Sequence, residues 1–484
     1  MPDETPPATT DPAAYPVLRS RKLRLLIPLI VAFAFFMEQL DATIVTTAIP
    51  DMARSLHVAP LQMNLTITAY VFSLAVFMPL SGWIADRYGA RRVFAAALVV
   101  FTAASALCGL SDSLGVLVAM RVLQGFGGAM MTPVGRLVLL RAFPRSELVT
   151  AMTYVTVPAV IGPALGPVLG GLLTTYASWR WVFYVNVPIG IVGVLLALRF
   201  VEDTRADRQA RFDVPGFLMC GVGLGLLQFA FENVGRPLLP WPAVLGLLAT
   251  GALLLAAYVP YARRRPDAAL DLSLFAIRTF RVGTLAGGLS RIGVNAVPFM
   301  LPLLFQIGFG LSPVQSGSLT FVSSLGTLVV RPVSARLMRR FGYRGLLSVN
   351  GVLCAAIIAG FALVQPTTPH WQVLLLVLVF GVARSTQFMT TNTLTYADTP
   401  PGKLSRSTSL GGVIQQLTVS FGVSAAAALL ELIAGPGRLP GVADFHEAFL
   451  VVALITLVSA PGFLRLRPED GAQVSGHRPK PAVP

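Results

Sequence analysis

The sequence predicts an all-α protein that crosses a membrane many times. The chain has 484 residues, of which 55% are hydrophobic and only 12% are charged, whereas about a quarter of the residues in a soluble chain are charged. Apolar runs of roughly 20 residues recur along the chain, and a helix of that length crosses about 30 Å of hydrocarbon. The runs lack the alternating pattern of membrane β-strands. Helices are therefore the expected spanning elements, because they satisfy their own backbone hydrogen bonds inside lipid.

Fourteen hydrophobic segments follow one another, and we expect each to be a transmembrane helix. The two longest polar connections, 202–213 and 262–280, divide them into six, two and six. The predicted helices cover approximately residues 24–49, 62–84, 92–110, 114–138, 149–175, 181–201, 214–233, 241–261, 281–308, 313–337, 346–365, 370–395, 407–434 and 446–465. The predicted parts are an N-terminal tail (1–23), a six-helix bundle (24–201), a two-helix insert with its flanking loops (202–280), a second six-helix bundle (281–467) and a C-terminal tail (468–484). An even number of crossings returns the C-terminus to the side of the N-terminus.

Basic residues indicate on which side of the membrane the termini lie. Of the 37 Lys and Arg residues, 28 fall on the N-terminal side of this topology and four on the opposite side. Because cytoplasmic loops carry an excess of Lys and Arg, both termini are expected in the cytoplasm. The net charge of +15 is then mainly an orientation signal with some attraction to anionic lipid, and nucleic acid is not needed to explain it. The remaining five basic residues lie within hydrophobic segments: Arg121, Arg136, Arg291, Arg331 and Arg384.

Two similar stretches follow the second helix of each six-helix bundle. They are "GWIADRYGARR" (82–92) and "ARLMRRFGYRG" (335–345), in which Gly89 aligns with Gly342. Repeated six-helix halves are a mark of secondary transporters. We expect the first stretch to form a tight cytoplasmic turn in which Asp86 pairs with an arginine or caps a neighbouring helix. The candidate gate residues are Gly82, Asp86, Arg87, Gly89, Arg91 and Arg92.

The fifth hydrophobic segment contains "GPALGPVLGG" (162–171), in which small residues recur every fourth position. This spacing gives one flat helix face that a second helix can approach closely, and the prolines make the helix easier to bend. The residues of this motif are Gly162, Pro163, Gly166, Pro167, Gly170 and Gly171.

The first hydrophobic segment carries two acids, Glu38 and Asp41, in "FFMEQLDATIV" (35–45). At 1.5 Å per residue, Asp41 lies about 10 Å from the outer end of its helix, and Arg121 in the fourth helix lies about 12 Å from the same side. The depths match, so we expect the two charges to pair, because burying either alone would cost several kcal/mol. The pair is either a proton-coupling device, released when Asp41 is protonated, or a fixed structural ion pair.

Glu38 lies one helical turn from Asp41, on nearly the same face. Two acids this close repel each other, which raises the proton affinity of one of them. Glu38 therefore either shares the proton work with Asp41, binds a second proton or contacts a cationic substrate. The alternative is that it faces water in the cavity and has no role.

Deep polar residues also occur in the second six-helix bundle. Arg291 and Arg384 fall near the membrane midplane, where snorkelling to water is difficult. Three deep arginines, counting Arg121, against two acids leave the C-terminal half cationic, which suits carboxylates and other anions. Alternatively, Arg291 and Arg384 neutralise helix C-termini or pair with backbone carbonyls. Arg136 and Arg331 are expected to be interfacial or gate residues, and Glu232 and Glu431 to lie at the outer rim. The predicted substrate cavity consists of Arg291, Asn295, Arg384, Gln387, Gln415 and Gln416.

Together with "LVAMRVLQGFGGAM" (117–130) and "WRWVFYVNVPIG" (179–190), these patterns resemble the major facilitator superfamily over residues 20–467. They are most similar to its fourteen-helix branch of drug/proton antiporters, the EmrB/QacA type, and within it to the MdtD- and HsrA-like bacterial exporters. The resemblance implies export of small molecules against proton entry, with the Gly/Pro segment as antiporter motif. It also points to organic anions or metal-citrate chelates as cargo, with lipophilic cationic drugs as the alternative. Glu38 departs from the amide usual at its position.

Other functional classes find little support in the sequence. There is no phosphate-binding GxxxxGK[ST] loop, and no nucleophile–base constellation or metal cluster, so we expect neither an ATP-driven pump nor an enzyme. A non-transporting membrane sensor would usually carry an extra domain, and only 17 residues follow Arg467. The expected partners are a small-molecule substrate, protons and the lipid bilayer, with no cofactor and no nucleic acid. We expect a monomer, working alone or with a periplasmic adaptor. Arginine outnumbers lysine 34 to 3, which suggests a G+C-rich bacterium and an inner-membrane location.

Overall fold

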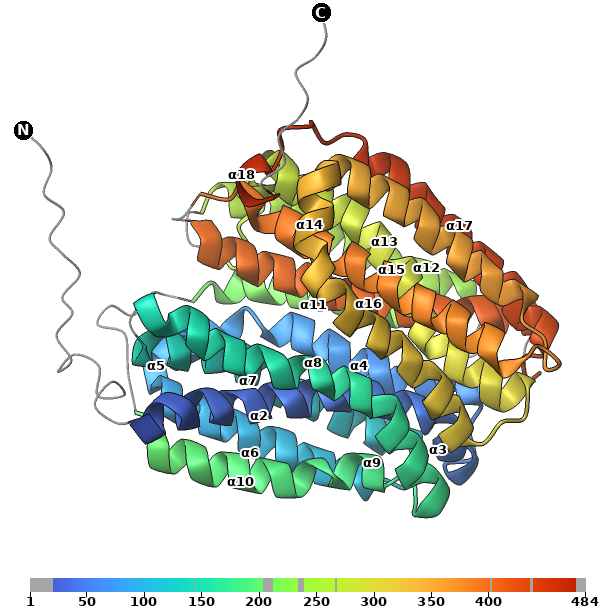
Figure 1. Cartoon of the computed structure of the whole chain (residues 1–484). Helices are drawn as coiled ribbons and strands as arrows, with labels where there is room; N and C mark the ends of the chain where they lie inside the picture. Colours follow the sequence, from blue (N-terminus) through green and yellow to red (C-terminus); the bar gives the residue numbers. More distant parts are fainter. Residues whose placement is uncertain are drawn as a thin grey trace, which may run out of the picture.

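The structure is a computed structural model that describes residues 21–143, 145–202, 212–233, 239–265, 268–400, 403–435 and 438–475. These residues form helices joined by short connections, which confirms the all-α prediction for them. Figure 1 shows two groups of long helices side by side, with the earlier part of the chain (blue to green) below the later part (yellow to red). Most of the predicted N-terminal tail lies outside the described residues.

The first group is the N-terminal bundle. We call the end of the molecule where α2 begins the terminal end, because the last described helix, α18 (Ala472–Ser475), lies there too (Figure 1), and the opposite end the far end. The elements of this bundle are α2 (Arg21–Ile44), η2 (Val45–Thr47), α3 (Ile49–Ser55), η3 (Pro60–Met63), α4 (Asn64–Phe77), α5 (Leu80–Tyr88), α6 (Ala90–Gly109), α7 (Leu114–Ala142), α8 (Arg145–Tyr176), α9 (Trp181–Tyr184) and α10 (Asn186–Phe200). The predicted second helix is broken between α4 and α5 at Met78 and Pro79, since proline has no N–H to continue the helical hydrogen bonds.

The second group is the C-terminal bundle, and a helix pair precedes it. The pair consists of α11 (Val214–Glu232) and α12 (Trp241–Arg263), followed by η4 (Leu272–Ala276). The C-terminal bundle contains α13 (Arg278–Leu303), η5 (Leu304–Gly308), α14 (Pro313–Gly360), η6 (Phe361–Leu363), α15 (His370–Ala397), α16 (Leu404–Ala434), α17 (Val442–Phe463) and α18 (Ala472–Ser475). The two bundles meet along two helix pairs, α8 with α14 and α4 with α16, and α11 packs beside α4 and α16.

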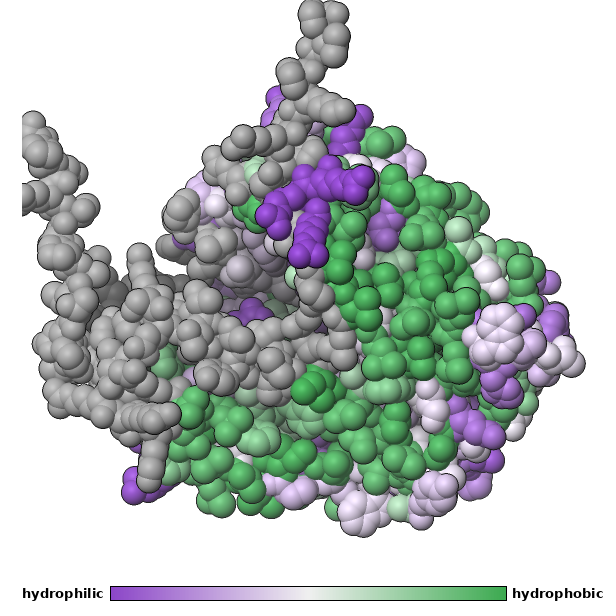
Figure 2. Space-filling view, viewed as in Figure 1, coloured by the Kyte–Doolittle hydropathy of each residue, from purple (hydrophilic) through white to green (hydrophobic). Residues whose placement is uncertain are grey.

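Twelve helices within the described residues are long and apolar enough to cross a membrane. Their lipid-facing character is visible on the surface, because large hydrophobic side chains such as Leu195, Leu253 and Val349 are more than half exposed. Figure 2 shows such side chains covering the flanks of the helices, while hydrophilic residues gather toward the ends. The chain is therefore a polytopic membrane protein.

The two stretches that echo each other in the sequence have the same backbone feature. Gly89 separates α5 from α6 with φ 96°, and Gly342 bends the long helix α14 with φ 63°. Residues with a side chain rarely adopt these left-handed conformations. The expected turn is therefore shorter than predicted: Gly82, Asp86 and Arg87 already belong to α5, and only Gly89 lies between the helices.

Short polar contacts hold the segments next to the bundles. Asp213 caps α11 by accepting hydrogen bonds from the backbone N–H groups of Gly216 (3.1 Å) and Ala269 (3.0 Å) and from the hydroxyl of Tyr261. Burial alone would raise the pKa of Asp213, but these hydrogen bonds outweigh it and hold the pKa below its usual 3.8. The Asp213 carboxylate therefore joins the start of α11 to α12 and to the connection that follows it.

The residues after position 467 are packed on the C-terminal bundle as far as the structure describes them. The carboxylate of Asp470 lies 3.6 Å from the Arg278 guanidinium at the start of α13. The backbone N–H of Gly471 donates to Asp398 over 3.2 Å, and α18 follows directly. The first part of the predicted C-terminal tail is therefore docked rather than free.

Candidate functional site

A buried ion pair joins the first and fourth predicted helices, as the sequence predicts. Nη1 of Arg121 on α7 lies 2.5 Å from Oδ2 of Asp41 on α2. The two side chains are 1% and 0% exposed. Removing either partner would leave a buried charge without compensation, which is strongly unfavourable. In this conformation each charge therefore depends on the other.

Arg121 has further partners that fix its position. Its Nε donates to the backbone carbonyl of Thr66 on α4 over 2.7 Å, and its Nη1 also donates to Oε1 of Gln124 over 2.7 Å. The guanidinium lies 4.2 Å from the centroid of the Tyr70 ring, a favourable cation–π distance. One arginine on α7 therefore connects α2 with α4.

Asp41 accepts two more hydrogen bonds through its other oxygen. Nε2 of Gln124 donates over 2.9 Å and Nδ2 of Asn186, at the start of α10, over 3.1 Å. The same amide of Asn186 lies 3.1 Å from the hydroxyl of Ser105 on α6. An ionised carboxylate only accepts hydrogen bonds, so three donors around Asp41 suit its charged form. The cluster lies within the N-terminal bundle and connects α2, α4, α6, α7 and α10.

The sequence analysis missed Gln124 and Asn186, although both carry a signal. Gln124 follows Arg121 by three residues, which places both side chains on one helix face. Asn186 is the one amide in "WRWVFYVNVPIG" (179–190), within the mostly apolar part that follows Arg180. A buried charge needs several hydrogen-bonding partners, so polar residues near the predicted depth of Asp41 are the candidates for these partners.

Glu38 lies one turn closer to the terminal end and has its own partner. The hydroxyl of Thr132 on α7 donates to Glu38, whose side chain is buried. Arg136, one turn further along α7, is exposed, lies within Coulombic range of Glu38 and is 5.8 Å from the Phe35 ring centroid. Asp41 is also within Coulombic range of Glu38. The structure therefore places the two acids close enough to influence each other, with the exposed guanidinium of Arg136 near Glu38.

In the C-terminal bundle, Arg291 on α13 is only 6% exposed. Its Nη2 donates to Oδ1 of Asn392 on α15 over 2.6 Å, and its guanidinium lies 5.2 Å from the Phe388 ring centroid. Its Nε finds no acceptor among the described residues. Asn392 was not predicted, and it supplies a neutral partner where an acid would have cancelled the charge.

The other predicted cavity residues do not form one group with Arg291. Arg384 on α15 is half-buried, and within the described part of the chain it has no hydrogen bond or ion pair. Gln387 faces α14 instead, where its carbonyl accepts from Asn350 over 2.9 Å. Asn295 lies against α16, with its Cβ 3.3 Å from the position that a Cβ on Gly422 would occupy. The half-buried Gln415 and Gln416 are on α16.

The small residues of "GPALGPVLGG" bring α8 against α2. A Cβ added to Gly166 would lie 2.1 Å from Oγ1 of Thr43, and one added to Gly170 would lie 2.4 Å from the carbonyl oxygen of Ile44. Gly162 meets the backbone of α2 one turn earlier, with a Cβ position 3.0 Å from the Phe36 carbonyl oxygen. The flat helix face predicted from the sequence is present, and its partner is α2.

The same segment also touches the other bundle at the far end. A Cβ added to Gly171 would lie 2.6 Å from the carbonyl oxygen of Pro313, and one added to Gly317 would lie 2.2 Å from that of Pro167. The hydroxyl of Ser324 on α14 donates to the Pro163 carbonyl over 3.4 Å. At Gly171 and Gly317 backbone lies against backbone, so α8 and α14 are closely apposed there.

The sequence of this chain matches the model of one protein family over most of its length. The model of the Major Facilitator Superfamily matches residues 31–423. The chain belongs to the Major Facilitator Superfamily. It is therefore a membrane transporter of that superfamily, and the resemblance seen in the sequence is confirmed.

Sequence relatives of this superfamily member include two bacterial MdtD proteins. It is 41% identical over 437 residues to the MdtD protein of Pectobacterium carotovorum, covering 90% of this chain and 94% of that one. It is also 41% identical over 441 residues to MdtD of Serratia proteamaculans, covering 90% and 92%. Both are named as multidrug resistance proteins. A solved D-xylose–proton symporter shares the fold with a TM-score of 0.66 and 14% identity, covering 92% of this chain and 98% of that one.

In this superfamily member, the predicted gate residues lie at the terminal end of the N-terminal bundle. Gly82, Asp86 and Arg87 are in α5, and Arg91 and Arg92 are in the first turn of α6. Asp86 is half-buried, whereas Arg87 and Arg92 are exposed. The glycine turn thus holds both basic and acidic side chains at one helix junction.

In this superfamily member, the position that the sequence analysis predicts for Glu232 is wrong. Glu232, expected at the outer rim, is only 5% exposed and accepts hydrogen bonds from three helices. Its helix ends against α4 and α16, and for that reason the side chain is covered.

The three cysteines are buried and free, and no three His, Cys, Asp or Glu side chains of the described residues gather as a metal site requires.

Proposed function

We propose that the chain is a proton-coupled exporter of small molecules that works by alternating access. The N-terminal and C-terminal bundles rock about a site between them, and the helix pair α11–α12 is an insert beside their interface. Export draws on the proton gradient and uses no cofactor. The proposal is supported by the superfamily membership and by the buried acid–arginine pair in the first bundle.

The topology that we propose has fourteen crossings in groups of six, two and six. Twelve of these crossings are the apolar helices found among the described residues. The other two are α8 and the part of α14 before Gly342. The basic residues that dominate one side of the predicted topology lie toward the terminal end, so this end faces the cytoplasm. Both termini are then cytoplasmic, the far end is the outer side, and the protein resides in a bacterial inner membrane as a monomer, alone or with a periplasmic adaptor.

The observation that carries proton coupling is the buried pair of Asp41 and Arg121. Asp41 can take up and release a proton, whereas Arg121 keeps its charge. Protonation of Asp41 leaves Arg121 buried without a counter-charge, so the protonated protein favours a conformation in which Arg121 finds water or another acceptor. Because Asp41 has no exposed surface here, a proton reaches it in the conformation that is open to the outside.

Glu38 extends this path toward the cytoplasm. It lies between Asp41 and the exposed Arg136, and it is held by a hydroxyl that can donate to either protonation state. We assign Glu38 the transfer of the proton from Asp41 to the cytoplasmic side. In this scheme Arg136 stabilises the ionised form of Glu38 once the proton has left.

The close contacts of α8 define the state that the structure represents. Gly171 and Gly317 bring the far ends of α8 and α14 into backbone contact, and Nε2 of Gln306 donates across the bundles to the Thr47 carbonyl over 3.1 Å. We assign this state as closed to the outside. The glycines allow the seal to form, and the gate residues around Gly89 would close the opposite end in the other state.

For the cargo we propose organic anions, including chelates of the metal-citrate type. Arg291 is buried with a neutral partner and a free Nε–H, and Arg384 has no partner among the described residues. Unsatisfied guanidinium groups bind carboxylates through charge-assisted hydrogen bonds. An anionic cargo would supply the acceptors that these two side chains lack.

The alternative cargo is a lipophilic cationic drug, which the names of the relatives favour. A cationic cargo would use Glu38 and the aromatic faces of the cavity. A binding screen of citrate, its iron chelate and ethidium distinguishes the two. For the anion reading we expect Arg291→Ala and Arg384→Ala each to weaken citrate binding at least about ten-fold, while Arg199→Ala, at the exposed end of α10, leaves it unchanged. Unchanged citrate binding in both variants would exclude the anion site.

The transport mode is tested in liposomes that contain the purified protein. An imposed pH gradient, acid outside relative to the cytoplasmic face, should drive substrate movement against its own gradient. Collapse of the gradient with a protonophore should stop it. Accumulation that persists without a proton gradient would show that the protein does not exchange substrate for protons.

A further inference from the structure

We propose that Glu232 is an outer latch: its ionised carboxylate ties the insert to both bundles while the outer side is closed, and protonation releases it. The proposal rests on the alternating-access function above. It concerns a carboxylate outside the Asp41 cluster, in the insert, and it gives the insert a part in the transport cycle.

Three side chains from three helices converge on Glu232. Nδ2 of Asn64, the first residue of α4, donates to its Oε2 over 2.6 Å. Nε2 of Gln228, one turn earlier on α11, donates to its Oε1 over 3.0 Å, and the hydroxyl of Ser424 on α16 donates to the same oxygen. Asn64 and Ser424 are each 1% exposed. One carboxylate therefore bridges the N-terminal bundle, the insert and the C-terminal bundle at the far end.

The arrangement suits the ionised form of Glu232, because all three hydrogen bonds are then charge-assisted and stronger than hydrogen bonds to a neutral carboxyl group. Each of the three contacts uses the carboxylate as acceptor, and a protonated carboxyl group has a donor in place of one of these acceptors. A proton on Oε2 would face the donor of Asn64 and break the tie to the N-terminal bundle. A proton on Oε1 would be donated to the Ser424 hydroxyl, which can instead donate to the Ser420 carbonyl over 3.0 Å, so the tie to the C-terminal bundle would lose its charge assistance. Either way, protonation weakens the link between α11 and one bundle.

The groups that face Glu232 from each packed element are neutral. They are Asn64 from α4, Gln228 from α11 itself and Ser424 from α16, and no Lys, Arg or His of the described residues forms an ion pair with Glu232. A second neutral contact lies one turn away, where the Ser420 hydroxyl donates to the Thr68 carbonyl over 3.4 Å. Two of the three hydrogen bonds that hold the charge of Glu232, those from Asn64 and Ser424, therefore exist only while α4 and α16 both lie beside α11.

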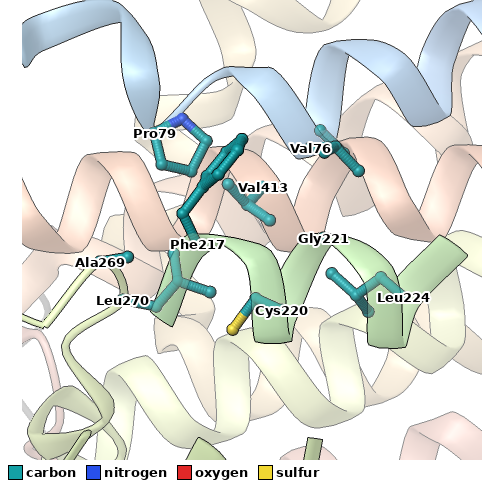
Figure 3. A pocket seen from close by; sticks show the side chains of 10 residues that line it. Val76, Pro79, Phe217, Cys220, Gly221, Leu224, Ala269, Leu270 and Val413 are labelled. Atoms are coloured by element: carbon teal, nitrogen blue, oxygen red, sulfur yellow. The ribbon is translucent and has the colours of Figure 1, made fainter. Parts of the chain in front are cut away.

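Towards the terminal end, the same three helices meet through apolar side chains. Figure 3 shows the crevice there, with Phe217 and Cys220 of α11 beside Val76 of α4, Pro79 in the break after α4, and Val413 of α16. Apolar contacts are non-directional and can slide. The directional link between α11 and both bundles is thus at Glu232, on the side from which protons enter, whereas the connection after α12 is tied to the C-terminal bundle by the Arg406–Asp271 ion pair.

Spin labels across the far end test the latch. Tyr176→Cys at the end of α8 and Leu363→Cys in η6 replace side chains that are 79% and 80% exposed, and the native cysteines are buried from the label. Distances between the labels are measured in an Asp41→Asn, Glu38→Gln background, which removes the two acids of the proposed proton path. We expect a short distance at neutral pH and a growing long-distance population on acidification.

Glu232→Gln mimics the protonated form, because its amide places a donor where the network needs an acceptor. We expect it to raise the long-distance population at neutral pH roughly five-fold and to abolish the response to acid. Glu447→Gln, an exposed acid at the same end, should behave like the parent. If Glu232→Gln folds poorly, Asn64→Ala and Ser424→Ala, which each remove one tie, should show the same shift.

A Glu232→Gln protein with parental distances and an intact acid response would overturn the latch. Proton-driven transport by the otherwise wild-type protein is recorded in parallel. If that transport is absent while the distances still respond through Glu232, the proposed function fails and the latch remains. If transport is normal and the distances ignore Glu232, the latch fails alone.

Discussion

Removing the charge of Asp41 should destabilise the protein through Arg121 rather than through the other partners of Asp41. In Asp41→Asn, the remaining carbonyl oxygen can still accept from Gln124 and Asn186, which both bind one oxygen of the carboxylate. The new amide nitrogen then faces Nη1 of Arg121, which lies 2.5 Å from the other oxygen. The cost is therefore that of a buried arginine facing a donor, about 3–5 kcal/mol.

A double-mutant cycle separates this cost from simple loss of packing. Arg121→Met replaces the guanidinium with an apolar side chain and should leave Asp41 as an uncompensated buried carboxylate, at a similar cost. The double variant buries no net charge, so it should be more stable than the sum of the single changes by about 2 kcal/mol or more. Equilibrium unfolding in mixed detergent micelles measures the free energy of unfolding of the wild type, the two single variants and the double variant.

Two outcomes would refute this reasoning. Single changes that each cost less than about 1 kcal/mol would match an exposed ion pair and contradict the burial of Asp41 and Arg121. Additive effects in the double variant would show that the two side chains do not interact. A fixed structural pair and a coupling pair give the same cycle, so stability alone does not assign the proton role.

Three further predictions follow from particular contacts. Gly166→Ala should destabilise the protein by about 1–3 kcal/mol, because the added Cβ would lie 2.1 Å from the Thr43 hydroxyl. The control is Gly246→Ala, where the added Cβ has no atom within 4 Å, and it should leave the stability unchanged or raise it by up to about 1 kcal/mol. Thermal unfolding compares the two variants. Asp213→Asn should lower the stability by about 1 kcal/mol at neutral pH, because the helix cap is lost. Since the pKa of Asp213 is held below 3.8, the stability difference between wild type and variant should be complete above that pH and should vanish as the pH falls through the pKa of the folded state. A stability difference that persists in strong acid would contradict this. Glu38→Gln should slow proton release to the cytoplasmic side while substrate still binds, which stopped-flow pH indicators measure, and an unchanged rate would remove Glu38 from the path.

Hydrophobicity alone located the helices, because a residue in lipid has few structural alternatives. The predicted segment 92–110 corresponds to α6 (Ala90–Gly109), and 214–233 corresponds to α11 (Val214–Glu232). The pairing of Asp41 with Arg121 was also predictable, because two buried opposite charges at one depth have little choice of partner. The single-residue turn at Gly89 was not, since helix ends depend on local backbone geometry rather than on hydropathy.

The second bundle and the insert were harder to predict from the sequence. Arg291 pairs with Asn392, a neutral residue that no charge count would select. Glu232 looked like a rim residue because it ends its helix, and only the packing of α4 and α16 around it makes it buried. Which face of a helix meets which neighbour depends on three-dimensional packing, and a single sequence shows that face only where small residues recur, as in α8.

The central claim is that Asp41 is the site that exchanges a proton for substrate. The most direct test is the release of protons when substrate is added to the purified protein in weakly buffered detergent solution, followed with a pH indicator. Wild-type protein should release protons, Asp41→Asn should release none while still binding substrate, and Asp86→Asn, in α5 at the terminal end, should release as many as wild type. Undiminished release from a folded Asp41→Asn protein would contradict the account.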